Sequence, residues 1–227
     1  MRRQASGLKV NEARWYEFLN SVAKTPGIYF YQDNTLVKRE EALVERFLNK
    51  HDPWHDPWLL DGAVRESYKL KTVDNKSETL ESLIHAIQKH SGTDQKRRNI
   101  VTVIDELMLN ALISAPRAAA EIGIQPKLGE SCLLAAEWTD EQIWVHMQDP
   151  WGAFLRDNFA KSFRPLGNHV ETHGHSGRGM QIILESCTDL YIGSEPGKLT
   201  WVAARFDLVL SNVEHDKVPK RLLLDMP

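Results

Sequence analysis

The chain has 227 residues, of which 42% are hydrophobic and 26% are charged, and its formal net charge is −3. This composition is typical of a globular protein with a sizeable core, and the small negative charge argues against a broad basic surface for nucleic acid or an anionic membrane. Its two cysteines form no CxxC pair, so neither a disulfide framework nor a zinc cluster is expected. No signal-like apolar segment opens the chain and no apolar run reaches the ~20 residues that span a bilayer, which favours the cytoplasm.

Residues 1–64 are interpreted as an extension of unknown role. Two runs with helical periodicity, at 11–24 and 38–50, flank an aromatic stretch at 25–35 that is typical of a short strand and turn. The tandem tetrapeptide HDPWHDPW follows at 51–58. Its histidines and aspartates could suggest a metal, but its prolines keep it extended and nothing fixes four ligands around one ion. We interpret it as a linker whose two tryptophans dock on the neighbouring domain.

From residue 65 the pattern predicts a two-layer α/β (α+β) sandwich, in which one mixed, mostly antiparallel sheet carries helices on one face. The polar segment at 153–176 is irregular, and the tail at 211–227 is expected to be peripheral. The regular elements expected in chain order are a strand at 66–73, a helix at 75–90, a loop at 91–98, a helix at 99–114 that ends before Pro116, a hairpin of strands at 131–139 and 142–149, a helix leading into a strand at 179–192, and a closing strand at 199–210.

Glu106 and Asn110 interrupt the apolar pattern of the second helix. Residues at i and i+4 lie on one side of a helix, and Ile104 and Leu107 face inward, so the polar pair is expected at the rim of the core, over a cavity. A carboxamide oxygen can ligate Mg²⁺, and a carboxylate one turn away can orient or deprotonate a nucleophile beside a phosphate. The alternative is a polar pair on a solvated helix face.

Three further features follow in order. Asp149 ends a strand, where a carboxylate can accept a hydrogen bond from an exocyclic amine such as that of adenine. The stretch GHSGRGM at 174–180 places glycines just before a helix, whose free N–H groups can meet phosphate, although a flexible loop would also explain it. Gly197 and Thr200 then precede the closing strand.

This order of motifs resembles the Bergerat-type ATP-binding fold of the histidine-kinase-like ATPases (the GHKL superfamily), and within it the small anti-sigma serine kinases of bacterial partner-switching systems. DELMLNALISAP looks like the N box and MQDPWGAF like the first glycine box. GHSGRGMQIILESCTDLYI is similar to the second glycine box with its helix, and GKLTWVAARF to the last glycine–threonine element. The resemblance covers about residues 65–210, which we interpret as the ATPase domain, with 1–64 as the extension and 211–227 as a tail.

The resemblance implies Mg²⁺ and ATP as cofactors. Glu106 matches the general base or water-positioning carboxylate, and Asn110 matches the Mg²⁺ ligand. Asp149 matches the acid that receives the adenine amino group, and Thr200 the hydroxyl that supports it. The remaining nucleotide-binding positions implied by the motifs are Gly152, Gly174, Gly177, Arg178, Gly179 and Met180.

The first glycine box departs from the family's pattern, because Trp151 stands where its first glycine would be. Either the register shifts by one residue and Gly152 floors the pocket, or the indole fills the adenine slot. The segment at 153–176 would form a lid, and one or two of its cations could close on the γ-phosphate, unless they are ordinary solvated charges. Its histidines lack the spacing of metal ligands on a rigid element. These basic side chains are Arg156, Lys161, Arg164, His169, His173 and His175.

The function expected is that of an ATP-binding regulatory protein, which phosphorylates a serine or threonine on a protein antagonist or sequesters a sigma-like partner. The alternative is a catalytically inactive nucleotide-binding or protein-binding module with residues 1–64 as its partner surface. Trp151 favours the module, and Glu106 favours the enzyme. The ATPase half of a sensor histidine kinase is disfavoured for lack of a spanning segment and a phosphoacceptor helix, and a metal hydrolase built on HDPW comes last. No direct nucleic-acid partner is expected, and a homodimer is expected only by analogy.

Overall fold

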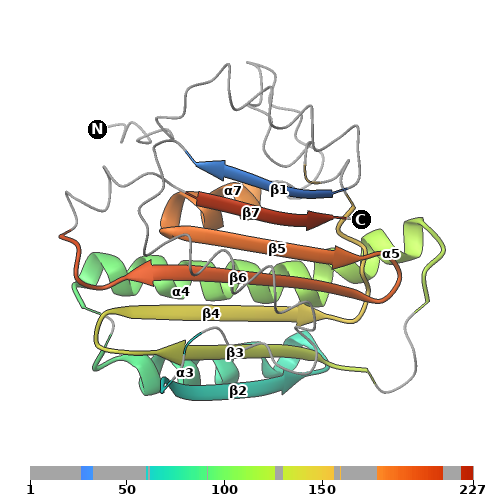
Figure 1. Cartoon of the computed structure of the whole chain (residues 1–227). Coiled ribbons are helices and arrows are strands. Elements are labelled where there is room, and N and C mark those ends of the chain that lie inside the picture. The colour runs from blue at the N-terminus through green and yellow to red at the C-terminus, as the bar shows by residue number, and fades with distance from the viewer. Residues whose placement is uncertain are drawn as a thin grey trace, which may run out of the picture.

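The computed structural model describes residues 27–32, 60, 62–90, 92–125, 130–155, 159, 178–211 and 221–226. A seven-stranded sheet forms one layer and helices form a second layer on one of its faces (Figure 1). All neighbouring strands are antiparallel except β5 and β7, so the predicted α+β sandwich with a mixed, mostly antiparallel sheet is confirmed. Across the sheet the strands are β1 (Gly27–Gln32), β7 (Arg221–Met226), β5 (Asp189–Glu195), β6 (Leu199–Asp207), β4 (Gln142–Asp149), β3 (Cys132–Trp138) and β2 (Val64–Leu70).

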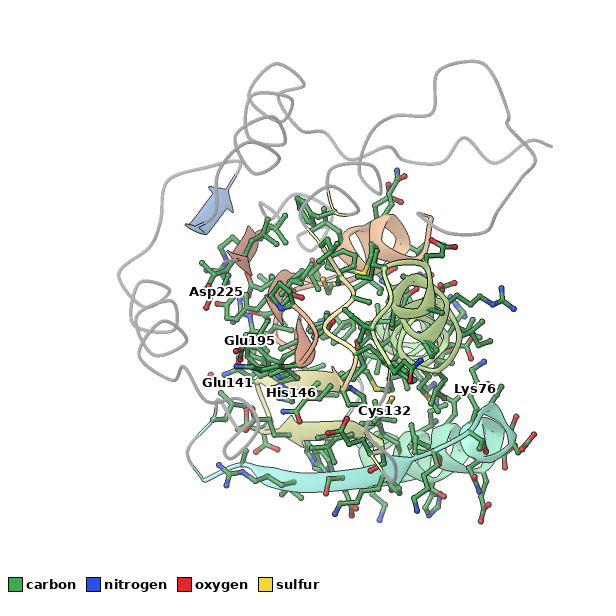
Figure 2. The ribbon with its side chains drawn as sticks, turned by 90° about the vertical axis from the view of Figure 1, so that its right-hand side faces the viewer. Lys76, Cys132, Glu141, His146, Glu195 and Asp225 are labelled. Atoms are coloured by element: carbon green, nitrogen blue, oxygen red, sulfur yellow. The ribbon has the colours of Figure 1, made fainter. Side chains whose placement is uncertain are left out.

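The helical layer lies on one side of the sheet in both views (Figures 1 and 2). Successive side chains of a strand point to opposite faces, so alternate residues such as Leu134, Val145 and Val202 meet the helices. They form one buried core with helical residues such as Ile104 and Ile183. The helices of the described part of the chain are α3 (Lys76–Ile87), α4 (Asp94–Leu109), α5 (Ala115–Glu121) and α7 (Arg178–Ser186), with a 3₁₀ turn at Val73–Asn75 before α3.

The second face of the sheet is also buried, and its residues are aromatic and charged. The His146 ring is stacked with the rings of Trp144 and Trp201, at interplanar angles of 14° and 12°. The buried Glu137 carboxylate lies 3.0 Å from His146 Nε2 and accepts a hydrogen bond of 2.9 Å from the Leu60 N–H. Its charge is therefore met from two sides, as a buried carboxylate requires.

A second buried carboxylate joins three strands on this same face. Asp189 of β5 is fully buried and pairs with Arg205 of β6 and Arg221 of β7. One acid between two guanidinium groups satisfies most of its hydrogen-bonding capacity. This triad fixes the C-terminal strand to the centre of the sheet.

The second predicted helix is correct in its centre and wrong at both ends. It begins at Asp94 because Thr93 caps it, with the threonine Oγ1 accepting from the Lys96 N–H at 3.4 Å. The predicted loop at 91–98 is therefore helical from residue 94. Lys96 is buried, and its Nζ donates a hydrogen bond of 2.8 Å to the Leu208 carbonyl just after β6. A lysine that the sequence pattern places in a solvated loop therefore anchors the end of this strand.

The helix also continues past the predicted stop, because a π-helical turn at Asn110–Ser114 accommodates Pro116. The Ala115 N–H bonds to the Asn110 carbonyl, five residues back, and α5 then runs to Glu121. By length and composition alone this run, 94–121, could cross a membrane. In this fold its residues Ile100 and Ile104 are in the core against the sheet.

The expectation of a peripheral tail is wrong for residues 221–226. These residues form β7, which lies between β1 and β5, with Leu222, Leu223 and Leu224 buried. β1 confirms the predicted aromatic strand and pairs with β7. The extension and the tail thus both contribute strands to the sheet of the predicted domain. The other helices and strands predicted from residue 65 onward are confirmed to within a few residues. The helical runs predicted at 11–24 and 38–50 lie outside the described residues.

Candidate functional site

Glu106 and Asn110 lie against the start of α7. A Cβ atom added to Gly179 would lie 2.6 Å from Glu106 Oε2 and 3.4 Å from both Oδ1 and Nδ2 of Asn110. The backbone of the second glycine motif therefore packs directly on the acid and the amide of α4. Asn110 Nδ2 also donates a hydrogen bond of 3.5 Å to Met180 Sδ in the first turn of α7.

The start of α7 supplies backbone donors at this contact. The first N–H groups of a helix have no partner within the helix, and the helix dipole places partial positive charge there. The described residues include the predicted phosphate turn only from Arg178 onward, and for Arg178 the structure describes the backbone alone. The other predicted members of the turn and lid lie outside the described residues; they are Gly174, Gly177, Arg156, Lys161, Arg164, His169, His173 and His175.

The Glu106 carboxyl is partly buried, and this burial raises its pKa. The charge of Asp105 raises the pKa further, whereas the charge of Lys76 lowers it. Lys76, at the start of α3, forms an ion pair with Asp105. A carboxyl whose pKa moves from its usual range toward neutrality is better suited to hold and release a proton near pH 7.

Asp149 is the last residue of β4 and lies opposite Thr200 in the β4–β6 register. Burial raises the pKa of the Asp149 carboxyl to about 7, although N–H groups of Trp151 and Gly152 and the Thr200 hydroxyl each favour its charged form. The Trp151 N–H donates to Asp149 Oδ1 at 3.0 Å. Thr200 Oγ1 is buried and, among the described residues, makes no hydrogen bond of normal geometry, although it lies near enough to lower this pKa. The pair thus retains capacity for a polar ligand.

Gly152 holds the end of β4 against the β5–β6 turn. Its φ is +54°, and an added Cβ would lie 2.1 Å from the Glu195 carbonyl oxygen and 2.7 Å from the Lys198 nitrogen. Its own carbonyl accepts from the Gly197 N–H at 3.3 Å. Close backbone packing therefore explains this glycine, and its role in the floor of a pocket stays a prediction. The side chain of Trp151 is partly exposed.

The π-helical turn connects the two halves of the site, and sequence reasoning missed it. A π pattern would pair the Ala111 carbonyl with the nitrogen of residue 116, but proline has no N–H. Cys132 Sγ instead contacts this carbonyl at 3.8 Å. Burial, with the charge of Asp149, raises the pKa of Cys132 to about 12. The apolar periodicity that continues beyond Pro116 is the signal that could have revealed this turn.

The residues present fit a magnesium nucleotide. Glu106 and Asn110 offer hard oxygen atoms at the backbone of Gly179, and Thr200 offers a hydroxyl beside Asp149. In the described part of the chain no three histidine, cysteine or acidic residues gather to hold an ion by themselves. The HDPWHDPW repeat lies outside the described residues.

Comparison with known proteins gives a limited result. No model of a protein family matches the sequence, and no curated protein matches it. Among solved structures, a chain of the SiaB–SiaC complex from Pseudomonas aeruginosa is similar with a TM-score of 0.42 and 12% identity, over 77% of this chain and 99% of that chain. A likeness this weak carries no functional argument.

Proposed function

We propose that this chain is an ATP-binding regulatory protein of the anti-sigma serine-kinase type, which binds Mg-ATP and controls a protein partner in bacterial signalling. The observation that carries the proposal is the contact of Gly179 with both Glu106 and Asn110. It joins the motif that resembles the N box to the motif that resembles the second glycine box. The partner, by analogy, is a sigma factor or an antagonist of an anti-sigma factor, and the place of action is the cytoplasm.

Each residue has a defined part in this proposal. Asn110 Oδ1 would hold Mg²⁺, which supplies charge neutralisation of the phosphates when it is bound. The N–H groups at the start of α7 would hold a phosphate oxygen. Glu106 Oε2 would accept the proton of the attacking serine or threonine hydroxyl, or of water, and its raised pKa suits that task. Asp149 would accept a hydrogen bond from the adenine amino group, with Thr200 beside it.

The second candidate function is a module with the same fold that binds a nucleotide or a protein partner without turnover. The observation that favours it is Trp151, which stands where the resemblance expects a glycine. The half-buried Glu106 beside Gly179 favours the enzyme instead, because binding alone needs no proton acceptor. Turnover therefore separates the two candidates, and homodimer formation is compatible with both.

The first test is thermal unfolding with ATP and ADP, with and without Mg²⁺. Binding adds RT ln(1 + [L]/Kd) to stability, which is about 2.7 kcal/mol at a hundredfold excess over Kd. We expect Asn110→Ala to lose the Mg²⁺-dependent part, whereas Asn99→Ala, on the same helix, keeps it. Absence of any shift in the wild-type protein at millimolar nucleotide would refute the proposal.

The second test separates the enzyme from the module. Glu106→Gln is expected to bind Mg-ATP with unchanged affinity and to lose ATP consumption or phosphoryl transfer. Glu185→Gln on α7, where the carboxylate accepts a hydrogen bond from Gln181 at an exposed position, is the matched control. If the wild-type protein binds nucleotide and shows no turnover that Glu106→Gln removes, the module is the correct reading.

A further inference from the structure

A metal-binding carboxamide has to present the correct end. The oxygen of an asparagine side chain accepts and can ligate a cation, whereas its nitrogen carries two N–H donors and cannot. Rotation by half a turn exchanges the two ends while the shape stays nearly the same. A site that uses Asn110 therefore needs a contact that distinguishes Oδ1 from Nδ2.

The backbone of Asn110 is fixed by the π-helical turn. Its N–H donates to the carbonyls of Glu106 and Leu107, and its carbonyl accepts from the Ala115 N–H. Pro116 removes the next donor along this turn. These bonds place the base of the side chain but leave the orientation of the carboxamide open.

Gly179 does not supply the distinction. The position of its missing Cβ is 3.4 Å from Oδ1 and 3.4 Å from Nδ2, so the contact limits the place of the carboxamide and treats its two ends alike. Glu106 Oε2 lies at the same glycine, at 2.6 Å from that position. The glycine brings the groups together without orienting the amide.

Met180 does supply it. Its thioether sulfur has lone pairs and no hydrogen, so it can accept from Nδ2, and it would repel Oδ1. The distance from Asn110 Nδ2 to Met180 Sδ is 3.5 Å. The methionine, in the first turn of α7, is 5% exposed and packs in the core. Among the described residues, this is the hydrogen bond that the Asn110 carboxamide makes.

We propose that Met180 is a positioning residue, which holds the amide nitrogen of Asn110 and so leaves Oδ1 directed to the divalent cation of a bound nucleotide. This inference rests on the proposed function, and it adds the role of a residue that touches neither metal nor reacting atoms. In this proposal the first turn of α7 has two roles, because its N–H groups would bind a phosphate oxygen and its Met180 would orient the ligand of the cation.

Met180→Leu removes the sulfur at nearly equal volume. We expect its Mg²⁺ requirement in the nucleotide melt to rise by about three- to tenfold, the worth of one weak hydrogen bond. Met147→Leu, at another buried core methionine, is the control and should keep the wild-type requirement. In the Asn110→Ala background, Met180→Leu should have no further effect. A wild-type Mg²⁺ requirement in Met180→Leu, or an equal effect in both backgrounds, would overturn the inference.

A second measurement keeps the test independent of nucleotide binding. In the free protein, the Asn110 side-chain NH₂ resonances, assigned by their loss in Asn110→Ala, should shift in Met180→Leu and not in Met147→Leu. Unchanged resonances would refute the orienting contact even if ATP binds. If the wild-type protein binds no nucleotide, the proposed function fails, and these resonances still decide the contact. If the leucine variant does not fold, norleucine incorporation removes sulfur with retention of chain length, and selenomethionine, which keeps the acceptor, should behave as wild type.

Discussion

Gly179→Ala is the substitution that tests the assembled site most directly. The added methyl group would start 2.6 Å from Glu106 Oε2 and 3.4 Å from both ends of the Asn110 carboxamide. An ordinary contact to carbon is about 3.5–4.0 Å, so the carboxylate has to move by about 1 Å and the carboxamide by a few tenths. The methyl group thus pushes the two side chains away from the start of α7.

The same change should cost little folding stability. Alanine is favoured over glycine in a helix by up to about 1 kcal/mol. Moving the end of a flexible glutamate off its preferred rotamer costs about 0.5–1.5 kcal/mol. The two terms nearly cancel, so the free energy of unfolding is expected to stay within about 1 kcal/mol of wild type. By contrast, a 1 Å misplacement of a catalytic group can reduce activity by about a hundredfold.

The assay is a pair of measurements on one preparation. Urea unfolding gives the free energy of unfolding, and the melting shift with Mg-ATP, together with ATP turnover, gives the function. Gly193→Ala is the control, because a Cβ there would meet its nearest neighbours at 4.0 Å, an ordinary contact on β5. That variant should keep wild-type function.

Two outcomes would refute the reasoning about Gly179. Retention of wild-type Mg-ATP binding and turnover would show that the contact between the two helices has no part in the site. A loss of more than about 3 kcal/mol in stability would show that the glycine is required for packing, as in other core overpacking.

Four further results are expected. Asp149 has a folded-state pKa of about 7 against an ordinary 3.8, so the free energy of unfolding contributed by this group falls as pH rises between about 4 and 7. Asp149→Asn should flatten that dependence and stabilise the free protein at pH 8 by at most about 4 kcal/mol. Urea titrations at several pH values measure both effects. Nucleotide affinity should rise through the same pH range, because the charged carboxylate is the better acceptor. Gly152→Ala forces a side chain at φ +54° into backbone atoms and should lose about 3 kcal/mol or more in a melt. Asp189→Asn removes the carboxylate charge that two buried arginines share, and the free energy of unfolding should fall by about 3–5 kcal/mol. Glu195→Gln removes one partner of an exposed ion pair with Lys198, and the free energy of unfolding should fall by less than about 1 kcal/mol.

The central part of the site could be predicted from sequence because it depends on local periodicity. Glu106 and Asn110 lie on one side of one helix, and the glycine motif opens the next helix of the layer, so the topology that the strand pattern implied brings them together. Asp149 and Thr200 could be paired for a similar reason, since each lies at the end of an antiparallel strand.

The missed features depend on contacts between residues far apart in the chain. β7 is a short leucine run whose place beside β5 is set by parallel pairing across 32 residues and by the Asp189 triad. Lys96 reads as part of a charged loop, and its burial depends on the carbonyl of Leu208, 112 residues away. The π turn depends on Pro116, which normally ends a helix. Local patterns contain none of this information.

The buried acids of this chain show how the fold separates structural from candidate functional groups. Asp189 lies between two arginines and Glu137 beside His146, so the protein itself meets their charges. Asp149 is also buried, but the groups that favour its charge are N–H groups and a hydroxyl, and its pKa rises to about 7. A buried carboxylate without a counter-charge destabilises the free protein, and a strongly shifted pKa in such a group marks a candidate functional site. Glu106 differs from these three acids, because it is only partly buried and the charge of Lys76 lowers its pKa, while its carboxylate packs against Gly179 at the start of α7.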